Sequence, residues 1–238
     1  MLGNGVSGDG KSVDGIDPVA LPDPAGFIRQ HTRIQTPPLV PELRLFLADE
    51  LTPLWQATED TLGKKGLEPP FWAFAWPGSQ GMARWILDNP AQIAGRRVLD
   101  VGTGGGLAAI AAARAGARAV ANDVDPMAIV AAHLNAAENG VVIQGVCADL
   151  LDTDLLDTDV DAELVIVGDL CYERALSERL LAWLHGLART RRVLMAEPGR
   201  AFAPRVGVRP VGTYVVPTLF DLENRTERTV VLLEIEAG

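Results

Sequence analysis

From Arg97 onward, short apolar runs alternate with segments of helical character. The apolar runs are RVLDV (97–101), AVAND (119–123), VIQGVCAD (142–149), residues 164–167 and RVLMAEP (192–198), and the helical segments are residues 107–115, 126–139 and 175–188. Strands that alternate with helices form right-handed βαβ units and so build a parallel sheet. The sequence therefore predicts an α/β fold with a Rossmann-like sheet.

The C-terminal region departs from this alternation. GTYVVPTLFD (212–221) and RTERTVVLLEIE (225–236) follow each other with little helical pattern between them, which predicts an antiparallel pair. Together with the five earlier runs, they predict a seven-strand, mostly parallel sheet with an antiparallel edge strand.

Three segments can be separated along the chain. Residues 1–26 are rich in Gly, Asp, Ser and Pro and predict a flexible arm. Residues 27–68 predict a small N-terminal helical extension, and the main domain spans residues 69–238. No internal repeat interrupts this order.

Two stretches of the extension carry local signals. Thr52 and Pro53 are typical of an N-cap and a first helical residue, and predict a helix that runs to about Leu62. In contrast, ELRLFL (42–47) fits both an alternating strand and one helical turn.

Composition limits the classes of partner. The chain has 238 residues, 48% of them hydrophobic, which suits one sizeable domain. Its formal net charge of −10 makes it a poor match for phosphate backbones, so we expect no nucleic-acid partner. The acidity suits a basic partner or a cationic substrate, and equally suits simple solubility.

Cysteine and histidine usage argues against metal or disulfide chemistry. The two cysteines, Cys147 and Cys171, form no C-x-x-C pair, which fits a reducing cytoplasm. The three histidines are far apart in sequence, so we expect no metal. No apolar run is long enough to span a membrane, and the first residues do not resemble a signal peptide. We therefore expect a cytoplasmic protein without a membrane partner.

A glycine-rich turn follows the first strand of the main domain. Four of the five residues from 102 to 106 are glycine, too many for a plain tight turn. A strand, a glycine turn and a helix N-terminus together present backbone N–H groups to a ligand. The dinucleotide pattern G-x-G-x-x-G/A fails because its sixth position is Leu107. The pattern D-x-G-x-G-x-G is complete, in Asp100, Gly102, Gly104 and Gly106.

This pattern resembles the signature of class I, seven-strand S-adenosylmethionine-dependent methyltransferases. The resemblance implies that residues 69–238 bind S-adenosylmethionine, and that the acid and the three glycines of the pattern contribute to its site. Asp123 ends the second strand about 20 residues after the loop, where a carboxylate can accept both ribose hydroxyls. Asp125 precedes Pro126 and is expected to cap the following helix.

Asp149 ends the third strand. In the family this place holds the residue that faces the adenine amino group, which would make Asp149 a cofactor-binding residue. A helix-capping role for the same side chain is an equally strong interpretation. The acidic segment that follows it, LDTDLLDTDVD (151–161), is expected to be a solvated loop.

The fourth strand ends in VGDLCYE (167–173). Its D-x-x-Y pattern, in Asp169 and Tyr172, resembles that of the family 16 lysine methyltransferases. This places Asp169 beside the methyl group of the cofactor, as both a catalytic and a cofactor-binding residue. Glu173 is expected chiefly to begin the next helix, and Cys171 to point into the core.

Lysine chemistry suits such a site. An ammonium has no lone pair, and with a pKa near 10.4 only on the order of one lysine in a thousand is neutral at pH 7. The enzyme must attract the cation, allow its proton to leave and aim the amine at the methyl group. Asp169 can attract the ammonium and then accept a hydrogen bond from the amine, while Tyr172 orients the nitrogen.

Four aromatic residues are concentrated in PPFWAFAWPGSQ (69–80), ahead of a helix expected over about 80–89. Phe71 and Phe74 are expected in the core, whereas Trp72 and Trp76 are expected at the site. The motif F-W-A-x-x-W-P-G-S-Q closely resembles that of the electron transfer flavoprotein beta-subunit lysine methyltransferases. This resemblance implies that Trp76 packs on the methionine part of the cofactor, with contacts from residues 78–80.

The same family resemblance extends over residues 36 to 200, and includes ANDVDP (121–126), GDLCYE (168–173) and EPGR (197–200). It implies a monomeric, S-adenosylmethionine-dependent protein-lysine N-methyltransferase that acts on the electron transfer flavoprotein beta subunit. One position departs from the family: Glu197 stands where members tend to have Asp. Arg200 is expected to be an exposed loop arginine rather than a substrate contact.

Three alternatives remain open. A small-molecule amine or nicotinamide-like N-methyltransferase would use the same sheet, although a shared fold is weak evidence for a shared function. Ribosomal-protein methyltransferases share D-x-G-x-G-x-G and N-D-x-D-P but have a different fourth-strand motif. A non-enzymatic binding module is disfavoured because Asp169 and Tyr172 are both present.

Overall fold

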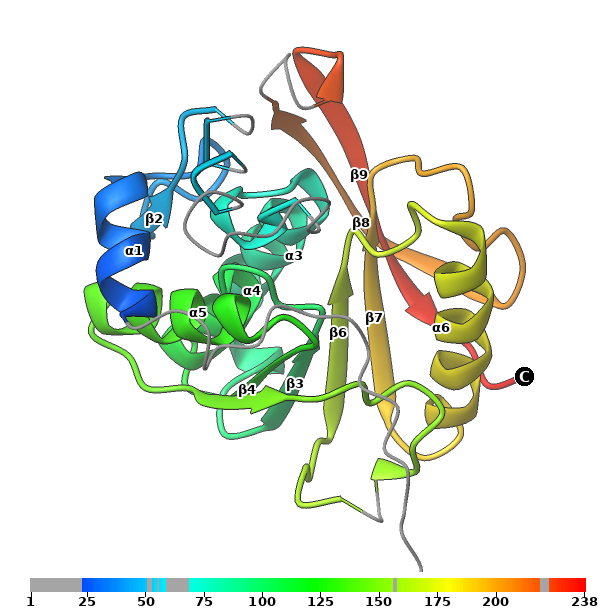
Figure 1. Ribbon diagram of the computed structural model, residues 1–238. Helices are drawn as coiled ribbons and strands as arrows, with labels where there is room; N and C mark the ends of the chain where they lie inside the picture. The colour runs from blue at the N-terminus through cyan, green and yellow to red at the C-terminus, as the bar shows by residue number, and fades with distance from the viewer. Residues whose placement is uncertain (1–22, 51–52, 55, 59–68, 156–157, 219–222) are drawn as a thin grey trace, which may run out of the picture.

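The computed structural model describes residues 23–50, 53–54, 56–58, 69–155, 158–218 and 223–238. Its centre is a seven-stranded sheet with the order β5-β4-β3-β6-β7-β9-β8 (Figure 1). The strands are β3 (Arg97–Val101), β4 (Arg118–Asp123), β5 (Gln144–Cys147), β6 (Leu164–Gly168), β7 (Arg192–Glu197), β8 (Val208–Pro217) and β9 (Glu227–Ile235).

The strand directions confirm the predicted fold class. Strands β3 to β7 are parallel to one another, whereas β9 is antiparallel to both β7 and β8. The antiparallel strand β9 therefore lies just inside β8, which forms the edge. The chain proceeds from β3 to β4 and β5 on one side, then returns to β6 on the other side of β3. In open α/β sheets, ligands bind at such a switch point, beyond the carboxyl ends of the strands.

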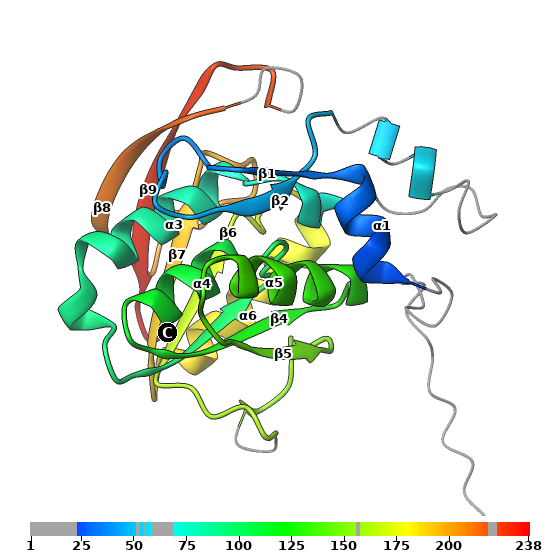
Figure 2. The ribbon, with the colours of Figure 1, turned by 90° about the vertical axis from the view of Figure 1, so that its left-hand side faces the viewer.

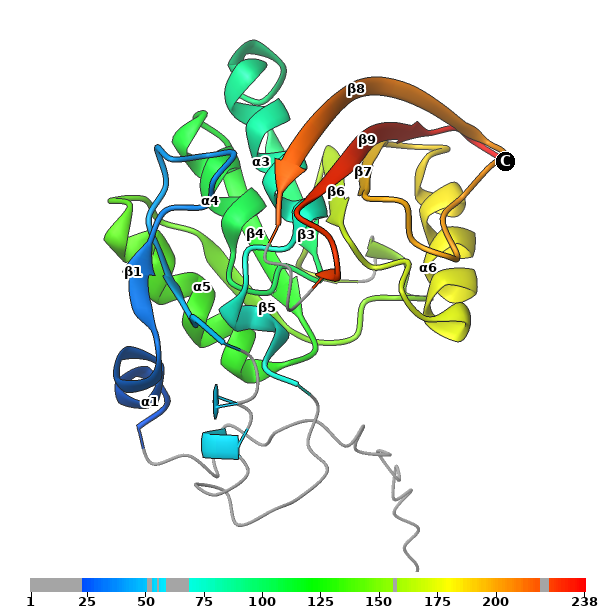
Figure 3. The ribbon, with the colours of Figure 1, turned by 90° about the horizontal axis from the view of Figure 1, so that it is seen from above.

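Helices cover both faces of the sheet. In Figures 1 and 3 they form two layers, one against each face. They are α3 (Pro77–Asp88), α4 (Leu107–Arg114) and α5 (Pro126–Glu138) on the first face, and α6 (Arg174–Leu187) on the second. The predicted helix over 80–89 begins earlier, at Pro77, because proline at a first helical position is favoured.

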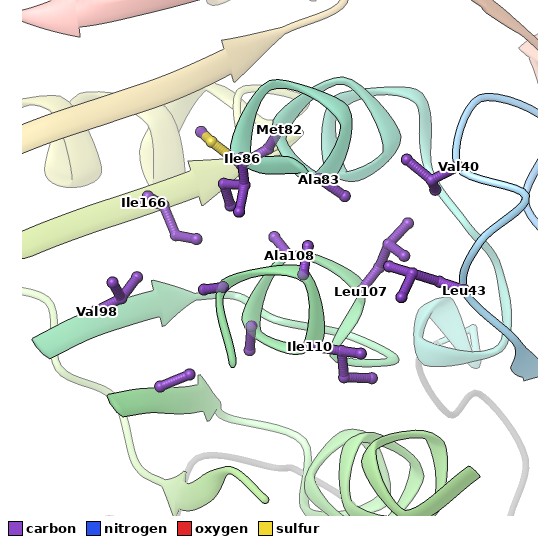
Figure 4. Close-up of a cluster of buried hydrophobic side chains, with 14 of the residues drawn as sticks. Val40, Leu43, Met82, Ala83, Ile86, Val98, Leu107, Ala108, Ile110 and Ile166 are labelled. Carbon is purple, nitrogen blue, oxygen red and sulfur yellow. The ribbon is translucent and has the colours of Figure 1, made fainter. Parts of the chain in front are cut away.

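Alternate strand residues supply the two halves of the core. Val98 and Ile166 pack beneath α3 and α4, against Met82 and Ile86 (Figure 4). Leu99, the neighbour of Val98, points to the opposite face and joins the cluster under α6. Successive strand side chains point to opposite faces, so strands buried on both faces become nearly continuous apolar runs.

The N-terminal extension contains a small sheet and a helix that was not predicted: the helix begins at Pro24, so residues 24–26 of the predicted flexible arm are helical. Helix α1 (Pro24–His31) is followed by the antiparallel pair β1 (Arg33–Gln35) and β2 (Leu45–Leu47), which lie beside α5 (Figure 2). The ambiguous stretch 42–47 therefore forms a strand at its end. Its Phe46 N–H donates to the Asn135 side-chain oxygen of α5 over 2.7 Å, which attaches the extension to the main domain.

Some expectations fall outside the described residues. Residues 1–22 of the predicted arm do so, as does most of the predicted helix from Thr52 to Leu62. Within the parts of the chain that the structure describes, no helix combines the length and the apolar character needed to cross a membrane.

Candidate active site

The glycine loop connects β3 to α4. Gly102, Gly104 and Gly106 all have left-handed backbone angles, with φ of +64°, +52° and +85°. Gly106 precedes α4 directly, and a Cβ there would lie 2.8 Å from the Ala132 Cβ. Each glycine of the D-x-G-x-G-x-G pattern therefore occupies a conformation that other residues adopt at a cost.

One loop position is open on its outer side. Around a Cβ built at Gly104, Trp72 Cα at 3.7 Å is the only described atom within 4 Å beyond the chain neighbours. A Cβ at Gly105, in contrast, would lie 2.7 Å from the Trp72 carbonyl oxygen. The Asn135 side chain also donates to the Gly105 carbonyl over 2.8 Å. The contacts from Trp72 and Asn135 therefore fix the loop at Gly105, whereas the backbone at Gly104 stays accessible.

Asp100 supports this loop from inside the protein. Its Oδ2 accepts hydrogen bonds from the Thr103 hydroxyl at 2.6 Å and from the Ala109 N–H at 3.1 Å. The carboxyl group is buried, and burial raises its pKa to about 7. Asp100 was predicted among the cofactor-binding residues, and this geometry gives it the role of shaping the loop.

The raised pKa of Asp100 predicts a pH-dependent stability. The native state holds a proton on Asp100 between its ordinary pKa of 3.8 and about 7, whereas the unfolded state does not. Stability therefore falls as the pH rises through this window. Asp100→Asn removes the titration, and its amide oxygen can still accept from Thr103 and Ala109. Because one pKa unit is worth about 1.4 kcal/mol and two units separate pH 5 from the pKa of about 7, raising the pH from 5 to 8 should cost wild type about 3 kcal/mol more than the variant.

Urea unfolding of both proteins at pH 5 and pH 8 measures this difference. The raised pKa values of Asp123 and Asp125 are common to both proteins and cancel in the comparison. Equal losses of unfolding free energy in wild type and Asp100→Asn would show that Asp100 does not titrate in this range.

Asp123 faces the loop from the end of β4. Its Oδ2 accepts the Gly104 N–H at 2.9 Å, and its Oδ1 accepts the Asp125 N–H at 3.0 Å. Burial raises the pKa of this carboxyl group. Asp125 caps α5 as predicted, because its side chain accepts the Met127 N–H at 2.8 Å. Asp123 therefore lies directly beside Gly104, the open position of the loop.

Asp149 lies beyond the end of β5 and is held by two partners. Its Oδ1 accepts the Leu151 N–H at 3.0 Å, and its Oδ2 pairs with Arg179 Nη1 of α6 at 2.7 Å. Arg179 also pairs with Asp152 and donates to the Leu151 carbonyl. No α-helix starts in the described residues between Asp149 and α6, so the helix-capping alternative is wrong and Asp149 caps a turn. Arg179 was not predicted, because nothing in the local sequence connects it to a residue 30 positions earlier.

Asp169 follows β6 in an unusual backbone conformation. Its φ is +63°, and only 4% of its side chain is exposed. A non-glycine residue in this region stores on the order of 1–2 kcal/mol of strain. The N-terminus of α3 lies against it, because the Gly78 N–H donates to Asp169 Oδ2 at 3.3 Å. A Cβ at Gly78 would lie 2.7 Å from the Asp169 nitrogen, so this close approach requires glycine.

Arg200 makes the main contact with the Asp169 carboxylate. Its Nε lies 2.6 Å from Oδ1 and its Nη2 lies 3.0 Å from Oδ2. The expectation of an exposed loop arginine is wrong, since the side chain is 17% exposed. The loop after β7 turns at Gly199, with φ of +83°, and brings Arg200 back over the end of β6.

Tyr172 belongs to a group of three rings, which we call the aromatic rim: Phe71, Trp76 and Tyr172. The Phe71 ring centroid lies 6.0 Å from that of Tyr172 and 5.7 Å from that of Trp76. Phe71 and Tyr172 are 38% and 50% exposed. The Trp76 indole N–H donates to the Phe71 carbonyl at 2.8 Å. The rim therefore presents ring surface close to Asp169.

Two of the four ring predictions are wrong. Phe71 is on the rim rather than in the core, and the Trp72 side chain is buried among the residues that join α1 to α5. Phe74 is in the core as predicted. A short 3-10 helix (Phe71–Ala73) turns Trp72 inward and Phe71 outward, which is the reverse of the prediction for these two rings.

This reversal predicts a large difference between two substitutions. Trp72→Ala should destabilise the protein by about 3–5 kcal/mol, because it empties a site where the side chain is almost fully buried. Phe71→Ala should cost about 1 kcal/mol, since the ring lies at the surface. Urea unfolding measures both, and equal losses would contradict the assignment.

Three further expectations near the site have clear outcomes. Cys171 points into the core as predicted, and burial raises its thiol pKa to about 12. Glu173 directly precedes α6, as expected for a helix start. Gln80 does not offer its amide to a ligand, because the amide N–H donates to Ala75 and the oxygen accepts from Leu39.

The arrangement fits S-adenosylmethionine. The open backbone at Gly104 admits a ligand that a side chain would exclude. Asp123 ends β4, Asp149 lies two residues after β5, and Asp169 directly follows β6 across the switch point. Leu170, the residue after Asp169, lies against the glycine loop, because a Cβ at Gly102 would lie 2.6 Å from its Cδ1.

Known proteins match this chain over most of its length. The family model described as ribosomal protein L11 methyltransferase (PrmA) matches residues 84–168. The electron transfer flavoprotein beta subunit lysine methyltransferase of Xenopus laevis is 39% identical over 75% of this chain and 71% of that protein. The protein of the same name from Mus musculus is 35% identical over 75% of this chain and 69% of its own length.

Among solved structures, magnesium protoporphyrin IX methyltransferase (ChlM) from Synechocystis PCC 6803 is similar to this chain. The TM-score is 0.49 at 18% identity, over 66% of this chain and 81% of that one. The identity to the lysine methyltransferases, over 75% of the chain, is what decides the assignment. The protein is an S-adenosylmethionine-dependent methyltransferase, and it belongs to the family of electron transfer flavoprotein beta-subunit lysine methyltransferases.

Proposed function

We propose that this protein transfers the methyl group of S-adenosylmethionine to a lysine side chain of the electron transfer flavoprotein beta subunit. One observation carries the proposal: Asp169 and the aromatic rim lie together where β6 ends, next to the glycine loop. The substrate comes from the names of the relatives.

The first task of the site is to receive an ammonium group. S-adenosylmethionine supplies an electrophilic methyl group on a sulfonium centre. The Asp169 carboxylate attracts the lysine cation, and then accepts a hydrogen bond from the neutral amine once the ammonium has released its proton to solvent water. A carboxylate offers about four acceptor positions. Arg200 and the Gly78 N–H contribute three donors to them, which leaves one position for the amine.

The second task is to orient the nitrogen. The half-exposed Tyr172 and its neighbour Phe71 form one wall of the approach to Asp169. Ring faces also attract cations within about 6 Å, so the rim favours an alkylammonium over a neutral side chain. A well-aimed amine gains much of its rate from orientation alone.

The direct test is intact-mass spectrometry of purified electron transfer flavoprotein beta subunit, incubated with this protein and S-adenosylmethionine. We expect mass increases of one methyl group or its multiples, located on lysine by peptide mapping. Asp169→Ala serves as the inactive control. If the beta subunit gains no mass while cofactor binding is intact, the substrate assignment is wrong, and transfer to a free amine would support the small-molecule alternative.

A further inference from the structure

An alternating chain of four charged side chains joins Asp169 to the β8–β9 hairpin: Asp169, Arg200, Glu223 and Arg228. We propose that Arg200 is a positioning residue of the methyl-transfer site, and that Glu223 holds Arg200 in place. Arg200 would aim the Asp169 carboxylate at the methyl position of the cofactor. The inference rests on the proposed function for the role of Asp169.

The contact between Arg200 and Asp169 has the geometry of a clamp. Both carboxylate oxygens receive a guanidinium N–H, at 2.6 and 3.0 Å. Such a paired contact fixes the orientation of the carboxylate as well as its distance, which a lysine ammonium does not do. The Gly78 N–H adds a third donor from the N-terminus of α3, so the carboxylate is held from two elements.

Arg200 is itself held on its other side. Its Nη2 lies 2.6 Å from Glu223 Oε1, and its Nη1 lies 3.1 Å from Oε2. Arg228 of β9 completes the series, with Nε 2.6 Å from Glu223 Oε2. The exposed fraction of these side chains is 3% for Glu223, 16% for Arg228 and 17% for Arg200. Each charge is thus paired where water is largely excluded.

The Arg200 backbone is anchored as well. Its N–H donates to Glu197, a buried carboxyl group whose pKa is raised by desolvation. Glu197 ends β7, so the loop between β7 and Arg200 is closed by a short contact to the sheet. Glu223 also lines a cavity of about 190 Å³ between the N-terminal extension and the hairpin. The chain of charged side chains therefore extends from the wall of this cavity to Asp169.

A buried pair of this kind can be purely structural, and its measured worth for stability is often small. The position of its acid favours the positioning role. Asp169 has a strained φ of +63°, and strain of this kind persists at sites where surrounding contacts enforce one geometry. The clamp by Arg200 acts on the side chain of that same residue.

The test compares two ligands that need no protein acceptor. Sinefungin carries an ammonium group where S-adenosylmethionine carries its methyl group, whereas S-adenosylhomocysteine carries nothing there. Calorimetry gives the affinity of each ligand, and their ratio reports how well Asp169 receives a cation at the methyl position. We expect Arg200→Gln to reduce the preference for sinefungin about tenfold, since a charge-assisted hydrogen bond is misplaced.

A double-variant cycle separates positioning from general stability. Asp169→Asn should reduce the preference by a similar factor, and Asp169→Asn combined with Arg200→Gln should reduce it no further. Arg200→Lys should fall between wild type and Arg200→Gln. The control is Arg205→Gln, an exposed arginine of the same loop, which should leave the ratio unchanged.

Several results would overturn the inference. The first is a wild-type protein that binds sinefungin and S-adenosylhomocysteine equally well. The second is a folded Arg200→Gln protein with the wild-type ratio of the two affinities. The third is a double variant in which the two single-variant reductions of this ratio multiply. If Arg200→Gln does not fold, Glu223→Gln leaves the clamp residues in place but loosens Arg200. It should shift the ratio about threefold in the same direction, and no shift would count against the proposal.

The outcome is independent of the acceptor. A coupled loss of sinefungin preference, with no methylation of the beta subunit by wild type, would support Arg200 and reject the proposed substrate. If wild type methylates the beta subunit but the reductions caused by the Asp169 and Arg200 variants multiply, the substrate is supported and the positioning role of Arg200 is rejected. If the beta subunit is a substrate, Arg200→Gln should also lower kcat about a hundredfold, as expected when a reacting group is displaced by about 1 Å.

Discussion

An Asp169→Ala protein is expected to methylate its acceptor about 10²–10⁴ times more slowly than wild type, with nearly unchanged affinity for S-adenosylhomocysteine. The carboxylate is the group that receives the lysine nitrogen, and aimed polar groups of this kind contribute factors of that size. It directly follows β6, whereas the glycine loop follows β3 and Asp123 ends β4. Initial rates by mass spectrometry and calorimetric titration measure the two quantities.

The control for this variant removes one negative charge near the start of the strands, at the opposite end from Asp169. Asp161 is 76% exposed in its side chain and pairs with Arg97, the first residue of β3. Asp161→Ala should keep the wild-type rate. Because Asp169→Ala also leaves Arg200 partly unpaired, Asp169→Asn is measured beside it as a shape-preserving variant. A rate within threefold of wild type in both Asp169 variants would remove Asp169 from the chemistry.

Gly104→Arg is expected to abolish cofactor binding, with the affinity for S-adenosylhomocysteine reduced by more than about a hundredfold. The glycine has a φ of +52° and faces open space, so the new side chain would enter the volume that the ligand needs. The backbone strain should cost on the order of 1–2 kcal/mol of stability. Calorimetry measures the affinity and urea unfolding measures the stability.

Gly140 provides a matched control for Gly104→Arg. It also has a left-handed conformation, with φ of +66°, and a Cβ there meets no described atom within 4 Å. It follows α5, away from the loop. Gly140→Arg should therefore show the same loss of stability without a loss of affinity. Similar affinities in the two variants would mean that the cofactor does not lie against Gly104.

The parts of the fold that were predicted correctly are those with a local signal. The strand that contains Val98 and Leu99 is apolar on both faces, and this is why it is recognisable as a buried strand of a parallel sheet. Pro126 and Asp125 mark the start of α5 by their own conformational preferences. The left-handed glycines of the loop are visible because only glycine adopts that backbone readily.

The aromatic stretch shows where local signals fail. Phe71 and Trp72 are adjacent in sequence and chemically similar, and one is at the surface while the other is in the core. Which ring is buried depends on the 3-10 turn and on the packing of α1 and α5 around it. Neither a hydrophobic pattern nor a propensity distinguishes two such neighbours.

The sequence of this protein was sufficient for the fold class, the glycine loop and the acids at or just after the ends of β4, β5 and β6, because each depends on neighbouring residues along the chain. The tertiary structure alone decided their partners. Arg179 reaches Asp149 from 30 residues away, and Arg200 reaches Asp169 from 31 residues away. The strength of an ion pair depends on the distance between the charges and on their burial in the folded protein, and the spacing of residues along the sequence determines neither.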